Sequence, residues 1–113
     1  MNFKQLVQKN RSYRRFYQEE KISKEQILEW IETSRYTPSG RNLQAIKYIV
    51  SVNGTSNRDI FNTLSWAGYL TEWNGPETGE QPSAYIVMLT DLSLSQNAAV
   101  DIGILAQTIL LAA

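Results

Sequence analysis

Two short runs of apolar and β-branched residues constrain the fold of this chain more than any other feature. Residues 46–52 and residues 84–89 have the composition of β-strands, and helical patterns precede, separate and follow them. Two strands among helices predict an α+β fold, or an α/β fold with a small sheet. The second run is almost continuously apolar, so we expect it to be buried on both faces. Two strands make an incomplete sheet, and we expect something else to pair with it.

Helical spacing of apolar residues predicts four helices, at residues 2–9, 24–36 and 57–67 and from residue 97 onward. The second has the clearest start signal, because Ser23 and Gln26 form a capping box, and Pro38 stops it. Ser56 with Asp59 predicts the start of the third. The last helix is apolar most of the way round, so we expect it to be buried.

A long loop is predicted between the third helix and the second strand, at about residues 69–83. Loops of this length without secondary structure are uncommon and are often functional. Trp66, Tyr69 and Trp73 flank it or lie in it, and they are candidates to stack on a planar substrate. Packing in a core or interface is the alternative, and we favour that alternative for Trp66.

The composition of the 113-residue chain restricts the chemistry to a short list. Its length predicts one domain over residues 1–113. It has no histidine and no cysteine, which excludes a Ser-His-Asp arrangement, a thiolate nucleophile and the common transition-metal ligands. We therefore expect no metal site and no catalytic side chain, and any redox chemistry would be carried by a bound cofactor. Eleven basic and eleven acidic residues cancel, which argues against a nucleic-acid partner.

The first candidate binding element is the arginine segment, residues 11–16. Arg11, Ser12 and Arg14 can converge on one anion, because guanidinium groups match phosphate oxygens in pairs and a hydroxyl adds a donor. A solvated surface loop that pairs with acidic neighbours is the alternative. Stacking of RNA bases on the aromatic residues of this segment is a further alternative, and the zero net charge counts against it.

The second candidate element is the proline bend, residues 38–44. Pro38, Ser39 and Gly40 offer backbone N–H groups, a hydroxyl and a close backbone approach, while Asn42 and Gln44 add amides that both donate and accept. This mixture suits the edge of a heterocycle. A turn that ends a helix and leads into a strand is the alternative. Asp101, near the start of the last helix, is expected to interact favourably with the helix dipole.

These motifs, in this order, resemble the FMN-dependent nitroreductase family over essentially the whole chain. The matching segments are Arg-Ser-x-Arg-x-Phe at 11–16, Ile-Ser-x-Glu-Gln-Ile at 22–27, Pro-Ser-Gly-x-Asn-x-Gln at 38–44, residues 79–87, and Asp-Ile-Gly with Ala-Gln at 101–107. The resemblance implies an α+β nitroreductase-like sandwich, with a small central sheet, helices on both sides and an intertwined homodimer. It also implies two FMN molecules at the dimer interface.

The same resemblance assigns roles to the two elements. Arg11, Ser12 and Arg14 would hold the FMN phosphate and ribityl chain. Pro38, Ser39, Gly40 and Asn42 would reach the flavin of the partner subunit, with Gln44 a weaker candidate. The implied reaction is ping-pong reduction of nitroaromatic, quinone or similar small-molecule acceptors by NAD(P)H, which requires no histidine or cysteine. No secretory signal or membrane-spanning run is visible, so we expect a cytoplasmic protein without a membrane partner.

The chain departs from the family pattern in two places. Many members have arginine where this chain has Asn10, so one phosphate contact is expected to be missing. The family also continues beyond the position of Ala113, so we expect a C-terminally truncated domain. The alternative function is a truncated, non-catalytic module that self-associates or binds a partner through an exposed apolar C-terminal helix.

Overall fold

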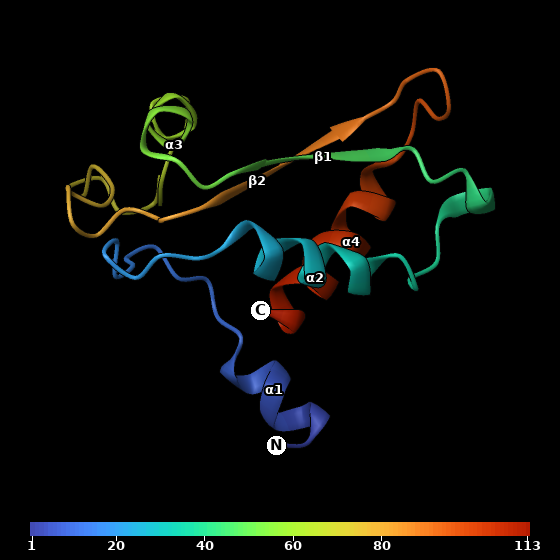
Figure 1. Ribbon diagram of the computed structural model, residues 1–113, viewed down its shortest axis with the longest axis horizontal. Coiled ribbons are helices and arrows are strands. Elements are labelled where there is room, and N and C mark those ends of the chain that lie inside the picture. Colours follow the sequence, from blue (N-terminus) through green and yellow to red (C-terminus); the bar gives the residue numbers. More distant parts are fainter. The chain divides into compact units, whose positions relative to one another are not determined.

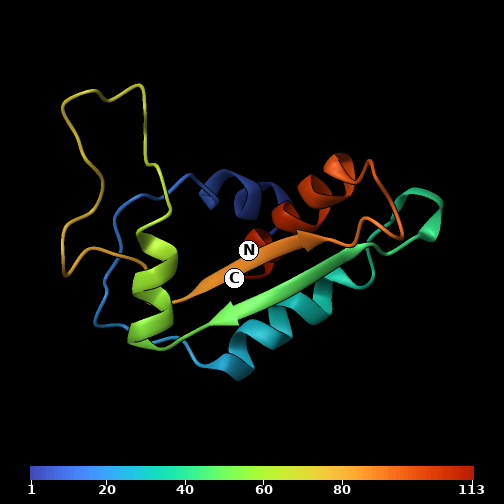
Figure 2. The ribbon, with the colours of Figure 1, turned by 90° about the horizontal axis from the view of Figure 1, so that it is seen from above.

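The computed structural model describes residues 1–113 and has the α+β fold that the strand and helix patterns predicted. The elements are α1 (Phe3–Lys9), α2 (Lys24–Ser34), a single 3₁₀ turn η1 (Gly40–Asn42), β1 (Ile46–Ser51), α3 (Gly54–Phe61), β2 (Tyr85–Thr90) and α4 (Ala99–Ala112). β1 and β2 pair with each other in a two-stranded sheet and run in opposite directions (Figures 1 and 2).

The chain divides into two compact units. Unit 1 consists of Met1–Arg11, Glu25–Ile49 and Ile86–Ala113, and unit 2 consists of Ser12–Lys24 and Val50–Tyr85. Most of the sheet, α1, almost all of α2 and the whole of α4 belong to unit 1, whereas α3 and the long loop belong to unit 2. The single domain expected from the length of the chain stays a prediction.

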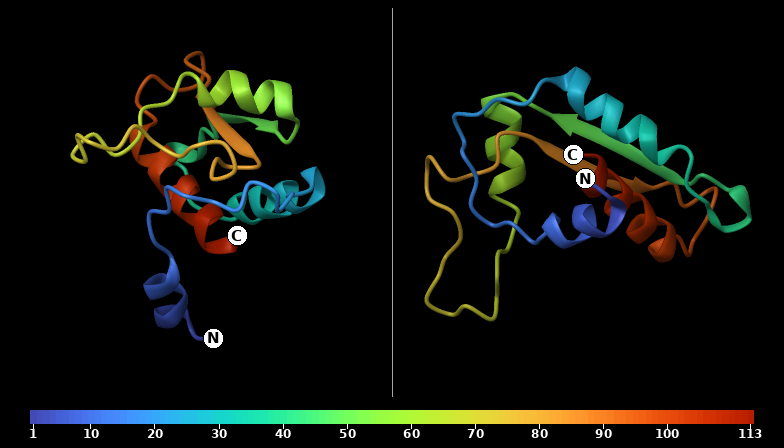
Figure 3. Two further views of the ribbon diagram at one scale, coloured as in Figure 1. Left: turned by 90° about the vertical axis from the view of Figure 1, so that its left-hand side faces the viewer. Right: turned by 90° about the horizontal axis from the view of Figure 1, so that it is seen from below.

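In unit 1, α2 and α4 lie against the same face of the sheet, α2 along β1 and α4 along β2 (Figures 1 and 3). The exposure of β1 alternates as this arrangement requires, because Ile46 is buried while Lys47 and Ile49 are exposed. The core of the unit is small and consists of Ile27, Ala45, Ile46, Ala98 and Ile109. The helices expected on the other face of the sheet are not part of this unit.

The N-terminal helix is capped and tied to α4 within the same unit. The Asn2 side chain accepts a hydrogen bond from the Gln5 backbone N–H, and the Gln5 side chain accepts one from the Asn2 N–H, both at 2.9 Å. At the other end of α1, Asn10 Nδ2 donates to the Leu110 carbonyl at 3.2 Å. Asn10, which stands where many family members are expected to have a phosphate-binding arginine, therefore joins α1 to α4 here.

Two expectations about burial are wrong. No residue of β2 is fully buried and Leu89 is 45% exposed, so this strand is not covered on both faces. In α4 only Ile109 is buried, while Val100 is 74% and Leu110 is 55% exposed. Much of the apolar surface of β2 and α4 is therefore not covered by other parts of the chain.

No helix has both the length and the apolar character needed to cross a membrane.

Unit 2 contains α3 and a long segment, residues 62–84, that forms no helix or strand. The expected start of the third helix at Ser56 is wrong, because Asn53 caps α3 and its Oδ1 accepts the Ser56 N–H at 2.9 Å. Asn57 organises the interior: Oδ1 accepts from the Ser51 hydroxyl at 2.6 Å, and Nδ2 donates to the Ser83 carbonyl at 2.8 Å. These bonds therefore fix the C-terminal end of the long loop, and the end of β1, to α3.

Candidate functional site

The part of the arginine segment that lies in unit 2, residues 12–16, is irregular, as the sequence predicted. It is held next to the far end of the long loop by a ladder of backbone bonds, from Phe16 N to Glu80 O at 2.9 Å and from Gln18 N to Gly79 O at 3.2 Å. The Gln18 side chain strengthens the ladder, because its Oε1 accepts the N–H groups of Gly79 (2.7 Å) and Gln81 (3.2 Å). Nothing in the sequence pattern singled out Gln18.

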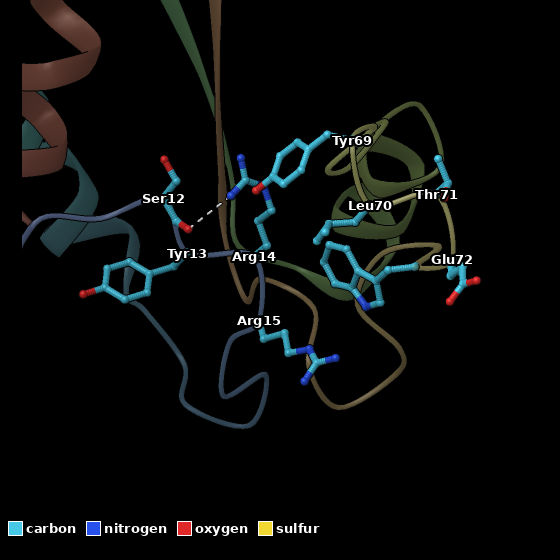
Figure 4. Close-up of a pocket in the computed structure, with 9 residues that line it drawn as sticks. Ser12, Tyr13, Arg14, Arg15, Tyr69, Leu70, Thr71 and Glu72 are labelled. Atoms are coloured by element: carbon cyan, nitrogen blue, oxygen red, sulfur yellow. Dashed lines mark hydrogen bonds between the residues drawn. The ribbon is translucent and has the colours of Figure 1, made fainter.

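A groove with a volume of about 780 Å³ runs along the segment (Figure 4). Two arginines face two aromatic rings of the long loop across it. The Arg14 guanidinium carbon is 5.8 Å from the Tyr69 ring centroid, and that of Arg15 is 5.7 Å from the Trp73 centroid. The groove is lined by Ser12, Tyr13, Arg14, Arg15, Tyr69, Leu70, Thr71, Glu72 and Trp73.

The two arginines differ in their polar partners. Arg15 Nε lies 3.6 Å from Glu80 Oε2, a contact between exposed groups that contributes little to stability. Arg14 makes no ion pair, and its one polar contact is a long bond from Nη1 to the Ser12 carbonyl at 3.4 Å. Stacking on Tyr69 leaves the N–H edges of the Arg14 guanidinium available to an anion. Arg11 belongs to unit 1, and its predicted convergence with Ser12 and Arg14 stays a prediction.

The aromatic substrate candidates separate into two environments. Tyr69, which is labelled in Figure 4, lines the groove, and so does Trp73. Trp66 does not; its ring packs against Phe61, with 5.8 Å between the centroids, and its Nε1 is buried without a hydrogen-bond partner. This position agrees with the packing role that the sequence analysis favoured for Trp66.

The proline bend lies in unit 1 and has an unusual backbone. Arg41, Asn42 and Gln44 all have positive φ angles, of 53°, 53° and 51°. Residues other than glycine rarely adopt this conformation, and such residues concentrate at functional sites. Pro38, Ser39 and Gln44 line a depression of about 310 Å³ at the root of the bend, whereas Asn42 is exposed outside it.

Asp101 accepts hydrogen bonds from two groups that the sequence analysis proposed as donors to a ligand, the Ser39 hydroxyl and the Gly40 N–H. Its Oδ2 accepts from the Ser39 hydroxyl at 2.9 Å, and its Oδ1 and Oδ2 accept from the Gly40 N–H at 3.1 and 3.3 Å. The Ser39 oxygen in turn accepts the Gln44 N–H at 3.0 Å. The expectation of a helix-dipole role missed this contact, because no sequence spacing relates residues that are 61 or 62 positions apart.

The side chains present fit a flavin mononucleotide. The groove lies within the range of about 300–1,000 Å³ typical of small-molecule sites. The Arg14 guanidinium without an ion pair suits a phosphate oxygen, and the rings of Tyr69 and Trp73 suit a planar group. In the bend, Asn42 and Gln44 carry exposed amides that can both donate and accept hydrogen bonds.

Comparison with solved structures finds close similarity of fold. A protein from Bacteroides thetaiotaomicron that is named an NADH dehydrogenase/NAD(P)H nitroreductase aligns with a TM-score of 0.74 and 23% identity, over 96% of this chain and 59% of the other. A protein of the same name from Parabacteroides distasonis aligns with a TM-score of 0.72 and 23% identity, over 96% of this chain and 60% of the other. A protein named as a nitroreductase in complex with FMN, from Desulfovibrio desulfuricans, gives 0.72 and 25%, over 99% and 62%.

The chain thus spans about three fifths of the length of these structures. A search of curated proteins found no match. The model of the nitroreductase family, in contrast, matches residues 7–113, which includes the arginine segment, the proline bend and α4. This match covers nearly all of the sequence and agrees with the fold of the solved structures, and the chain therefore belongs to the nitroreductase family.

Proposed function

We propose that this chain is the FMN-binding portion of an oxidoreductase that uses NAD(P)H to reduce nitroaromatic, quinone or similar acceptors. Family membership supports an oxidoreductase, and the nitroreductase from Desulfovibrio desulfuricans is in complex with FMN. The choice of NAD(P)H as donor is supported by the names of the proteins from Bacteroides thetaiotaomicron and Parabacteroides distasonis. The observation that carries the proposal is the groove in which Arg14, without an ion pair, lies beside the exposed ring of Tyr69.

Within the proposed site, the residues of this chain bind and orient. Arg11, Ser12 and Arg14 hold the phosphate and ribityl chain, with the Arg14 guanidinium kept in place by Tyr69. Pro38, Asn42 and Gln44 contact the ring system, while Ser39 and Gly40 act through the bend because their donors are engaged by Asp101. When bound, FMN supplies the hydride and electron transfer that no side chain here provides. Tyr69 and Trp73 cover the acceptor.

The proposal extends to a homodimer with FMN at the interface and to a cytoplasmic location. The exposed apolar residues of α4, including Val100 and Leu110, support the dimer, because apolar surface of this kind is normally covered. The same surface supports the second candidate function, a module that self-associates without catalysis. Reduced nicotinamide nucleotides are cytoplasmic electron donors, which is the basis for the proposed location.

FMN titration of the purified chain tests the proposal. We expect a yellow protein, or a flavin signal that changes on addition of FMN. Arg14→Ala should weaken FMN binding about 10-fold to 100-fold, since a hydrogen bond to a charged group contributes about 1.5–3 kcal/mol. Arg14→Lys should fall between, because it keeps the charge and loses the planar fork.

Arg58→Ala is the matched control, because Arg58 is an exposed arginine on α3 that makes no ion pair. It should bind FMN like the unaltered chain. A colourless protein without any flavin response would remove the enzymatic proposal and leave self-association. Equal affinity of the Arg14→Ala variant would place the phosphate elsewhere.

A further inference from the structure

We propose that Asp101 is a positioning residue that holds the proline bend in the conformation in which it meets the flavin. The role toward the flavin rests on the proposed function, whereas the restraint that Asp101 places on the bend rests on contacts within unit 1. Asp101 lies in the first turn of α4, and the bend leads into β1. One carboxylate thus connects the start of a helix to the backbone of residues 39–44.

The bend requires an external restraint because its own backbone is strained. Arg41, Asn42 and Gln44 occupy the left-handed region, which is unfavourable for residues other than glycine. Two local backbone bonds oppose this cost, from Asn42 N to Ser39 O at 2.8 Å and from Leu43 N to Gly40 O at 3.2 Å. Asp101 supplies the polar contact that comes from outside the bend.

The contact acts through a relay. The Ser39 hydroxyl donates a hydrogen bond to Asp101 Oδ2, so its lone pairs are left to accept the Gln44 N–H. The carboxylate therefore fixes the near end of the bend through Gly40 and the far end through Gln44. Asparagine at position 101 would match the shape of aspartate, but one of its two terminal atoms would donate rather than accept. It would break the relay on one side or the other.

Tryptic cleavage after Arg41 tests the hold without any flavin. Arg41 is exposed and lies in the middle of the bend, so cleavage there requires the bend to open. Asp101→Asn and Ser39→Ala should each raise the initial rate of cleavage at Arg41 about ten-fold or more, in proportion to the open population. Ser39→Thr keeps the hydroxyl and should restore the slow rate.

Two controls separate a local hold from general loss of stability. Cleavage after Arg58, on α3, is followed in the same digests, and Glu29→Gln, which removes one negative charge at an exposed site on α2, is the control variant. We expect both to behave like the unaltered chain. Unchanged cleavage at Arg41 in Asp101→Asn and Ser39→Ala, or an equal rise at Arg41 and Arg58, would overturn the proposal. If Asp101→Asn does not fold, Ser39→Ala with its threonine partner gives the same comparison.

FMN titration of the same variants tests the connection to the flavin. If the unaltered chain binds FMN, Asp101→Asn should bind at least about ten-fold more weakly and shift the flavin absorbance bands. Faster cleavage at Arg41 together with unchanged flavin affinity and spectrum would refute the positioning role. If the unaltered chain shows no flavin signal while cleavage responds as expected, the proposed function fails and the hold on the bend stands.

Discussion

The indole of Trp66 occupies the space that a side chain at position 75 would need. A Cβ on Gly75 would lie 2.6 Å from Trp66 Cδ1 and 2.9 Å from Cγ, and Gly75 has a φ angle of +102°. Both the close approach and the backbone conformation therefore require glycine at this position. Since Trp66 also packs against Phe61, the last residue of α3, a shift of the ring would disturb that contact.

Replacing Gly75 by alanine should therefore destabilise the chain by about 2–4 kcal/mol, as the sum of backbone strain and overpacking. Gly79→Ala is a matched control, because Gly79 has a similar φ angle of +97° with no atom within 4 Å of the added Cβ. It should cost only the backbone term, about 1–2 kcal/mol. Urea unfolding followed by tryptophan fluorescence measures both. Equal losses for the two variants would show that Trp66 does not clash.

The proline bend combines a sequence that predicts a turn with a conformation that the sequence does not reveal. Pro38, Ser39 and Gly40 mark the end of a helix and a change of direction, and the structure contains both. However, the positive φ angles fall on Arg41, Asn42 and Gln44 rather than on the glycine. This conformation is unfavourable for arginine and glutamine, and the bend that contains it is bonded to Asp101. A local sequence pattern could not predict that contact, because Asp101 is distant in the sequence.

Glycine at position 41 should relieve this strain. We expect Arg41→Gly to raise the free energy of unfolding by about 0.5–1 kcal/mol, and Arg41→Val to lower it by more than about 1 kcal/mol, because a β-branched residue tolerates positive φ poorly. Thermal unfolding monitored by circular dichroism gives the order of the variants. A valine variant as stable as the unaltered chain would contradict the backbone conformation at this position.

Element boundaries show what could be predicted locally. The strands at 46–52 and 84–89 and the helices at 2–9 and 24–36 are observed within two residues at each end. The third helix was placed too late, because the Ser56 signal competed with the stronger Asn53 cap. The predicted burial of β2 and α4 rests on composition alone. An apolar composition indicates that a segment favours burial, but it does not show whether residues of the same chain cover the segment.

At the scale of the whole molecule, residues 12–16 of the arginine segment belong to unit 2, whereas Arg11 and the proline bend belong to unit 1. This division limits what a sequence can predict about the site. The residue types of the two elements and their order along the chain identified the nitroreductase family and the α+β fold, which the family match and the structure confirm. Their assembly into one site depends on contacts between distant segments. The assignment of FMN contacts to Arg11, Ser12, Arg14 and the bend stays a prediction.

Association of two copies through α4 is the prediction that belongs to the scale of the whole molecule. Leu110→Glu should lower the sedimentation coefficient from that of a dimer toward that of a monomer, because it introduces a charge into an exposed apolar face. Leu92→Glu is the control, since Leu92 is 66% exposed and lies outside α4. A monomeric unaltered chain at micromolar concentration, or a Leu110→Glu variant that remains dimeric, would contradict the assignment of α4.

The stacking of Arg15 on Trp73 gives the groove an optical reporter of its own. Indole emission is sensitive to a neighbouring cation and overlaps the absorption of oxidised flavins. Binding of a flavin in the groove should therefore be visible as quenching of the Trp73 emission, without a dye or a turnover assay. Substitution of Trp66 and Trp30 by phenylalanine would leave Trp73 as the single tryptophan.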